Sequence, residues 1–150
     1  MFRGATKVTV DDKGRVVVPT RYRRLLAGPG EGRVVVTVDP DECLLVYPAP
    51  DWEPIEQQLM SLPSLNPQAR RLQRLMVGHA DELELDSHGR ISLSPELREF
   101  AGLTRGAWMV GQGRRLEIWD EGRWNLRRAE WMKAEQAGGE PSAALESLQL

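Results

Sequence analysis

The chain contains one cysteine, Cys43, and two histidines, His79 and His88, among its 150 residues. A single thiol cannot form an internal disulfide, which is typical of a reducing compartment. So few nitrogen and sulfur ligands give no metal-binding cluster. The apolar stretches are too short to cross a bilayer, and Met1–Gly4 lacks the apolar core of a secretion signal. We therefore expect a soluble cytoplasmic protein with no membrane partner, no metal and no cofactor.

Patterns of catalytic residues are also scarce. Asp86, Ser87 and His88 are neighbours in one expected turn, where side chains diverge, whereas catalytic triads converge from separate elements. The glycines do not form a phosphate-binding fingerprint. We expect neither an enzymatic activity nor a small-molecule substrate.

An internal repeat dominates the rest of the sequence. Residues 11–21 and 86–96 share Asp-x-x-Gly-Arg, a short apolar strand and a proline at the start of a helix. The same register holds for Lys7–Val10 and Glu82–Leu85. After a three-residue contraction the match resumes, with Leu44–Tyr47 and Trp52 corresponding to Leu116–Trp119 and Trp124. Such a repeat predicts two pseudo-symmetric copies of one structural unit.

The fold class predicted from hydrophobic patterning is mainly β with short helices (α+β). We expect a single globular unit over residues 1–150. Its parts are repeat one (5–52), connecting helices (51–77), repeat two (80–124), a C-terminal helix (121–136) and a loose tail (138–150).

Local patterns add expectations for the first repeat and the connecting helices. The Val16–Val18 run favours burial on both faces of its strand. A helix over 21–27 is expected to start at Pro19 and Thr20, with Thr20 as a possible cap, and to bury its apolar side chains Tyr22, Leu25 and Leu26.

Caps are also expected at the helices that follow. Asp51 is the candidate cap of the first connecting helix, Asn66 and Pro67 are expected to open the second, and Ser94 is the candidate cap in the second repeat. Trp52 and Trp124 occupy matching positions and are interpreted as core anchors rather than as a base-stacking platform.

The two copies differ in charge although their patterns agree. Residues 5–25 contain six basic and two acidic residues, whereas residues 80–100 contain two basic and six acidic residues. Folding alone does not require this contrast. We infer that the two halves have different partners, a polyanion for the first copy and a neighbouring subunit for the second.

The doubled Asp-x-x-Gly-Arg unit, each copy followed by a short helix, resembles the swapped-hairpin β-barrel of AbrB/SpoVT-type DNA-binding proteins. The tandem pair and the Met-Phe-Arg-Gly start resemble the MraZ family over roughly residues 1–135. This resemblance implies a barrel made by the two halves of one chain. It also implies a nucleoid-associated transcriptional regulator of the division and cell-wall gene cluster, which binds short tandem repeats in double-stranded promoter DNA and assembles into a ring-like homo-oligomer. Arg15 and Lys13 match the family's DNA-contacting turn.

The cations of the first copy suit DNA independently of the resemblance. Lysine and arginine release condensed counterions from phosphates, and the planar arginine fork can bond guanine O6 and N7 together. We expect Gly14 to let the backbone approach a phosphate, Arg15 to read base edges, and Lys13, Arg3 and Lys7 to hold phosphates. The complete set of candidate DNA-binding residues is Arg3, Lys7, Lys13, Gly14, Arg15, Arg21 and Arg24.

Structural interpretations of the same residues remain open. Arg15 and Arg90 can form ion pairs with Asp11 and Asp86, so the motif can serve the fold alone. Arg21, Arg23 and Arg24 can form the ordinary solvated face of their helix. Arg70, Arg71 and Arg74 can likewise be the solvated side of the second connecting helix, or they can contact another subunit. The alternative function is an antitoxin-like or ring-forming scaffold that does not read DNA.

Overall fold

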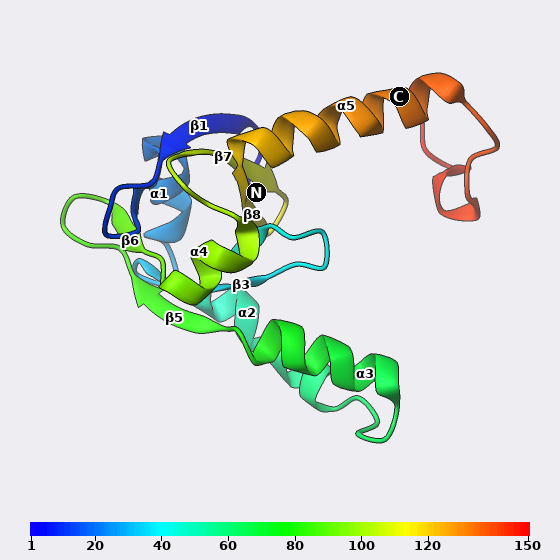
Figure 1. Ribbon diagram of the computed structural model, residues 1–150. Helices are drawn as coiled ribbons and strands as arrows, with labels where there is room; N and C mark the ends of the chain where they lie inside the picture. The colour runs from blue at the N-terminus through cyan, green and yellow to red at the C-terminus, as the bar shows by residue number, and fades with distance from the viewer.

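The computed structural model describes residues 1–150 and contains a six-stranded antiparallel sheet, a two-stranded ribbon and short helices (Figure 1). The first repeat contains β1 (Ala5–Thr9), β2 (Arg15–Val17), α1 (Thr20–Leu26), β3 (Arg33–Val38) and β4 (Leu44–Pro48). The connecting segment contains α2 (Ala49–Met60), α3 (Pro67–Leu72) and the π-helical turn η1 (Gln73–Val77). The second repeat contains β5 (Asp81–Glu84), β6 (Arg90–Ser92), α4 (Pro95–Ala101), β7 (Gly106–Gln112) and β8 (Arg115–Asp120). Helix α5 (Glu121–Ala137) and the 3-10 turn η2 (Ala143–Leu145) follow.

The two repeats exchange strands. The sheet order is β1-β7-β8-β4-β3-β5, so β1 of the first repeat pairs with β7 of the second, and β5 of the second pairs with β3 of the first. The two hairpins meet at the centre, where β4 pairs with β8. Strands β2 and β6 pair only with each other as strands and form the separate ribbon.

The mainly β class with short helices is confirmed, but the sheet does not close into the expected barrel. Strands β1 and β5 are its two edges. The elements that could join these edges are the three-residue strands β2 and β6, and these satisfy one another. Only a single bridge, between Val10 and Val16, links the ribbon back to the β1 segment.

Alternation along the strands gives the sheet two apolar faces. Val34, Val36 and Val38 of β3 belong to a core of 21 buried residues that also contains Val16 and Ile91 of the ribbon. The ribbon therefore covers one face of the sheet.

The expected burial of both faces of the Val16–Val18 strand is wrong. Val16 and Val18 are fully buried, but Val17 is 51% exposed, because the ribbon has the sheet on one side only.

The opposite face carries a second, smaller core. Val35 and Tyr47 of the sheet pack there with Trp52 of α2 and Trp119 of β8, while Trp124 of α5 packs against them. The Trp52 residue is only 3% exposed to solvent, which confirms its assignment as a core anchor.

The helix ends follow the sequence in part. The side chain of Ser94 accepts a hydrogen bond from the backbone N–H of Leu97, which confirms the expected cap. The expected helix start at Asn66 is confirmed too, and there the side chain of Asn66 accepts from the N–H groups of Gln68 and Ala69. Asp51 and Thr20 do not cap.

Proline takes the cap position at both of those helices. Pro48 precedes α2, which places Asp51 inside the first turn, and Pro19 precedes α1. Leu25 is 41% exposed rather than inward, because α1 is only seven residues long and packs through Tyr22 and Leu26.

Two helical projections extend beyond the sheet on the same side of the molecule in Figure 1: the α2–α3–η1 hairpin and α5. We call the hairpin part, residues 57–80, the arm. No helix in the chain combines the length and the apolar content that a bilayer crossing requires.

The alternation in β2 predicts unequal costs for two adjacent substitutions. Val16→Ala should lower the free energy of unfolding by about 2 kcal/mol, because it removes buried methyl groups and leaves a cavity. Val17→Ala should change it by less than about 0.5 kcal/mol, because Val17 faces solvent. Urea denaturation of both variants measures the difference, and equal effects would contradict the one-sided burial of the ribbon.

Candidate nucleic-acid interface

The first Asp-x-x-Gly-Arg segment forms a tight turn organised by one carboxylate. Asp11 Oδ1 accepts hydrogen bonds from the backbone N–H groups of Lys13 (2.9 Å) and Arg15 (2.8 Å). Asp11 Oδ2 accepts a third from Arg15 Nε at 2.7 Å. Gly14 has a φ of +81°, a conformation that L residues with a Cβ rarely adopt. The turn thus depends on the aspartate and the glycine, and the arginine side chain adds one bond to the same carboxylate.

The second turn repeats this arrangement. Asp86 accepts from the N–H of His88 (2.8 Å), from the N–H of Arg90 (2.9 Å) and from Arg90 Nε (2.8 Å), and Gly89 has a φ of +73°. The ion-pair interpretation of the motif is therefore confirmed in both copies. Shared geometry cannot distinguish the functions of the two turns, so the difference between them must lie in what surrounds each one.

Hydrogen bonding also lowers the pKa of both turn carboxylates. The backbone N–H of Arg15, followed by its guanidinium, holds the pKa of Asp11 below its ordinary value. In the second turn the backbone N–H of Arg90, followed by its side chain, lowers the pKa of Asp86 from 3.8 to about 2. Both turns therefore carry an ionised aspartate that fixes its arginine.

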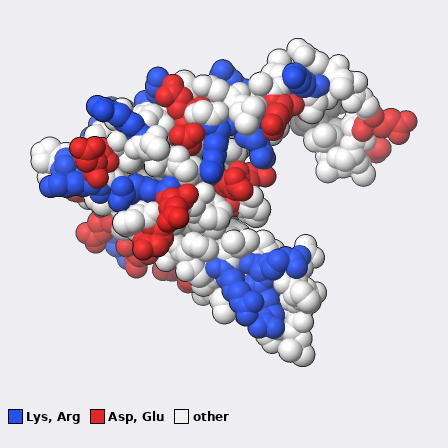
Figure 2. Space-filling model, viewed as in Figure 1, with Lys and Arg blue, Asp and Glu red and all other residues white.

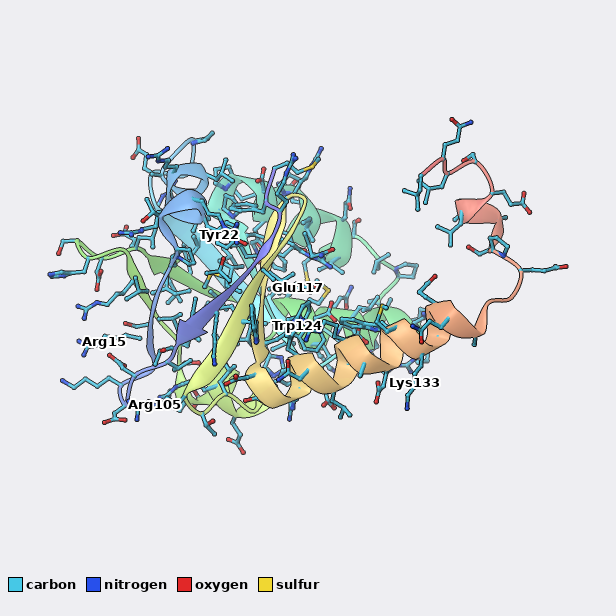
Figure 3. All side chains as sticks on the ribbon, turned by 90° about the horizontal axis from the view of Figure 1, so that it is seen from above. Arg15, Tyr22, Arg105, Glu117, Trp124 and Lys133 are labelled. Carbon is cyan, nitrogen blue, oxygen red and sulfur yellow. The ribbon has the colours of Figure 1, made fainter.

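The ion pair leaves the outer part of Arg15 available. Asp11 bonds only to Nε, and the terminal nitrogens Nη1 and Nη2 of Arg15 have no hydrogen-bond partner within the chain. The side chain is 34% exposed and projects at one end of the molecule, as Figure 3 shows. Asp11 consequently aims a guanidinium fork outward, the group that recognises guanine edges and phosphates.

The other predicted DNA-binding residues do not form one cluster with this turn. Arg21 bonds to Thr6 Oγ1 and to the Tyr22 hydroxyl, which donates in turn to the Gly4 carbonyl at 2.6 Å. Arg21 thus fastens the N-terminal segment to α1. Lys7 pairs with Glu121 at 2.8 Å, on the exposed edge strand β1.

The three remaining cations of the predicted set are exposed and form no ion pair within the chain: Arg3, Lys13 and Arg24. Lys13 lies in the first turn itself. Arg3 precedes β1, whose five residues separate it from that turn by about 17 Å. Only Lys13, Gly14 and Arg15 of the predicted set therefore lie together in one turn. The expected approach of the Gly14 backbone to a phosphate is wrong, because Gly14 is buried and both its backbone groups are bonded within the chain.

Strand exchange supplies each turn with an arginine of the other repeat, which sequence reasoning missed. A methyl group at Gly14 would lie 2.6 Å from Nε of Arg98, a residue of α4. Correspondingly, the Arg23 side chain of α1 covers Gly89 in the second turn. Arg23 and Arg98 are separated by the repeat offset, so the sequence reveals that they correspond, but not that they exchange places.

The residues that resembled catalytic or metal-binding groups form no such site. Ser87 Oγ lies 3.3 Å from His88 Nδ1, but the Asp86 carboxylate is occupied by Arg90 and by backbone N–H groups. No group of three or more His, Cys, Asp or Glu side chains is placed to hold a metal ion. Cys43 is fully buried, and this burial raises the pKa of its thiol.

Comparison with known proteins adds independent information. The family model described as "MraZ protein, putative antitoxin-like" matches the chain twice, over residues 1–75 and 76–140. Among similar proteins, the "Transcriptional regulator MraZ" of Thioalkalivibrio sulfidiphilus is 57% identical over the full length of both chains. That of Serratia proteamaculans is 51% identical, also over the full length of both. That of Nitrosospira multiformis is 55% identical over 85% of this chain and 86% of its own.

The low pKa of Asp86 predicts an acid-dependent contribution to stability. Since the folded value lies below the ordinary one, the ionised carboxylate stabilises the folded state above about pH 4, and this contribution is lost as the pH falls through about 2. Asp86→Asn should therefore have a lower melting temperature than the wild type at neutral pH, with a gap that closes toward pH 2. Asp12→Asn is the control, because Asp12 is exposed and accepts no hydrogen bond. A gap independent of pH would contradict this role of the carboxylate.

Proposed function

The chain belongs to the MraZ family, and on that premise we propose that it is a sequence-specific DNA-binding transcriptional regulator. The names of the similar proteins support regulation of transcription rather than catalysis. By its resemblance to the family, its target is the promoter of the division and cell-wall gene cluster, bound through short tandem repeats. It then acts in the cytoplasm, in association with the nucleoid.

The observation that carries the proposal is the pre-oriented Arg15 in the first turn. Holding Nε on Asp11 fixes most of the side-chain torsions before DNA arrives, which reduces the entropy lost on binding. The free Nη groups then bond a base edge, while Lys13 faces a phosphate. Gly14 serves the turn instead of the expected phosphate approach, because it is buried and its N–H and C=O are bonded to Asp11 and Leu93. Arg3, Lys7 and Arg24 serve as outer phosphate contacts, and Arg21 acts by holding the N-terminal segment that carries Arg3.

The proposed role of Arg15 predicts loss of DNA binding without loss of the fold. Arg15→Ala should abolish the binding of an operator duplex in a mobility-shift assay. Its melting temperature should change little, because exposed ion pairs contribute little to stability. Arg90→Ala is the matched control, since it removes the same ion pair from the second turn. A collapse of the fold in Arg15→Ala would favour a purely structural role.

The alternative function is a ring-forming or antitoxin-like scaffold that does not read DNA. Operator and scrambled duplexes at equal salt separate the two possibilities: a regulator prefers the operator, and its affinity falls steeply with salt as phosphate contacts are lost. Equal and salt-insensitive responses would favour the scaffold.

We further propose that the chain assembles with copies of itself through the arm. Residues 57–80 contain three arginines and no acidic residue. These arginines, Arg70, Arg71 and Arg74, are exposed and form no ion pair, and Figure 2 shows basic side chains with no acidic ones among them on this projection. A groove at α2 and β5, at the base of the arm, is lined by Trp52 and by Glu53, Glu56 and Glu82, and the last of these also pairs with Arg33 at 3.6 Å.

A basic arm and an acidic groove on the same chain are complementary in a head-to-tail contact. Such a contact leaves one arm and one groove free at each end, and it forms a ring when the rotation between subunits closes. Assembly would also place several Arg15 side chains on one DNA with repeated sites, which multiplies weak individual contacts.

Charge reversal tests this assembly. A variant with R70E, R71E and R74E should dissociate to monomers in sedimentation velocity, and so should a variant with E53R and E56R, because like charges then face each other. An equimolar mixture of the two should assemble again, since every arm then meets a groove of opposite charge. Arg24→Glu, on α1, should leave assembly unchanged. Monomers in the mixture, or intact assemblies in both single variants, would contradict the arm–groove contact.

A further inference from the structure

The surroundings of the first turn contain two arginines that come from the second, acidic repeat. We propose that Arg98 and Arg105 form part of a phosphate-binding surface centred on Lys13, Gly14 and Arg15. This inference rests on the proposed DNA-binding function. It adds two residues of the second repeat, whereas the sequence predicts DNA binding by the first repeat alone. Its basis is strand exchange, which joins the two repeats at this end of the molecule.

Arg98 lies directly against the turn. Its guanidinium covers Gly14, where a methyl group would be 2.6 Å from Nε and 2.9 Å from Cζ. Arg98 Nε donates to the Leu93 carbonyl at 3.2 Å, and Leu93 N–H donates to the Gly14 carbonyl at 2.8 Å. No acidic side chain pairs with Arg98. Its charge is therefore fixed beside the backbone of the turn and is not neutralised.

Arg105 lies beside the segment that leads into the same turn. Its carbonyl accepts the N–H of Val10 at 2.7 Å, one residue before Asp11. Its side chain is exposed and has no hydrogen bond or ion pair within the chain. In Figure 3, Arg15 and Arg105 lie at the same end of the molecule, and Lys133 lies toward the other.

The second turn lacks this surface despite its identical backbone bonds. There Leu85, which corresponds to Val10, donates its N–H to the carbonyl of Gly32 at 2.9 Å, so a glycine occupies the place that Arg105 has at the first turn. The equivalent of Arg98 is Arg23, but it lines a groove that also contains Glu31 and Asp86. The first turn thus has two additional unpaired cations, whereas the second has one cation with acidic neighbours.

Unpaired cations beside a base-reading arginine suit a ligand that is itself a chain of phosphates. Phosphate contacts position a protein on the duplex and contribute affinity without sequence preference. Arg98 and Arg105 are accordingly assigned to the DNA backbone, and the reading of bases remains with Arg15.

The salt dependence of DNA binding tests this assignment. Each lost phosphate contact makes the negative slope of log affinity against log salt shallower by about 0.9. The drop in affinity between about 50 and 200 mM salt then becomes about 3.5-fold smaller. Arg105→Ala should show this change equally for operator and scrambled duplex, because only a backbone contact is removed. Arg98→Gln should show it too, with an unchanged melting temperature as the test that the turn persists.

Arg114→Ala is the matched control. Arg114 is exposed and unpaired, and the seven residues of β7 place it about 20 Å from Arg105 at the other end of that strand. It should retain the wild-type slope. Wild-type slopes in Arg105→Ala and Arg98→Gln, with operator binding still abolished by Arg15→Ala, would overturn this inference and leave the proposed function intact. A slope change in Arg114→Ala as large as that in Arg105→Ala would also overturn it, because the effect would then reflect net charge. A wild-type chain that binds neither duplex would overturn both proposals.

Discussion

Neither repeat can complete its own sheet, because the first strand of each one pairs with the hairpin of the other. The ribbon has the same dependence, since β2 and β6 contribute three residues each and have no other strand partner. Most of the large core lies between these exchanged elements, with Val16 and Ile91 buried against the valines of β3. The two halves must therefore fold together, and any surface at the ends of the ribbon is built from both.

Exchange also explains how a duplicated motif can support two different surfaces. The bonds from Asp11 and Asp86 to their arginines agree within about 0.1 Å, so the turns are equivalent as structures. Their surroundings differ, although each turn receives an equivalent arginine from the opposite repeat, Arg98 at the first turn and Arg23 at the second. Arg105 lies beside the first turn, whereas the groove at the second contains Glu31. The charge around each turn therefore cannot be inferred from the net charge of the repeat that contains the turn.

The ion pair and the DNA contact were alternatives when only the residue types were considered. In the structure Asp11 bonds to Nε of Arg15, whereas Nη1 and Nη2 have no partner within the chain, so the proposed DNA contact would use different atoms from the ion pair. A structural pair can therefore prepare a functional group, which is economical in a small protein. The same pair occurs in the second turn, so a difference in DNA binding between the two turns would have to come from the charges around each one.

Sequence alone determined the features that depend on local bonding. The repeat and the mainly β class follow from the pattern of residues along the chain. The helix starts at Asn66 and Ser94 and the Asp–Arg turns follow from side chains that bond to residues two to four positions away. Tertiary structure decided the rest: the open sheet, the exposure of Val17 and Leu25, and the presence of Arg98 and Arg105 beside the first turn. The physical reason is that periodicity specifies which face of a strand is apolar but not which distant strand will cover it. Partner choice is settled only when both repeats bury their apolar faces together.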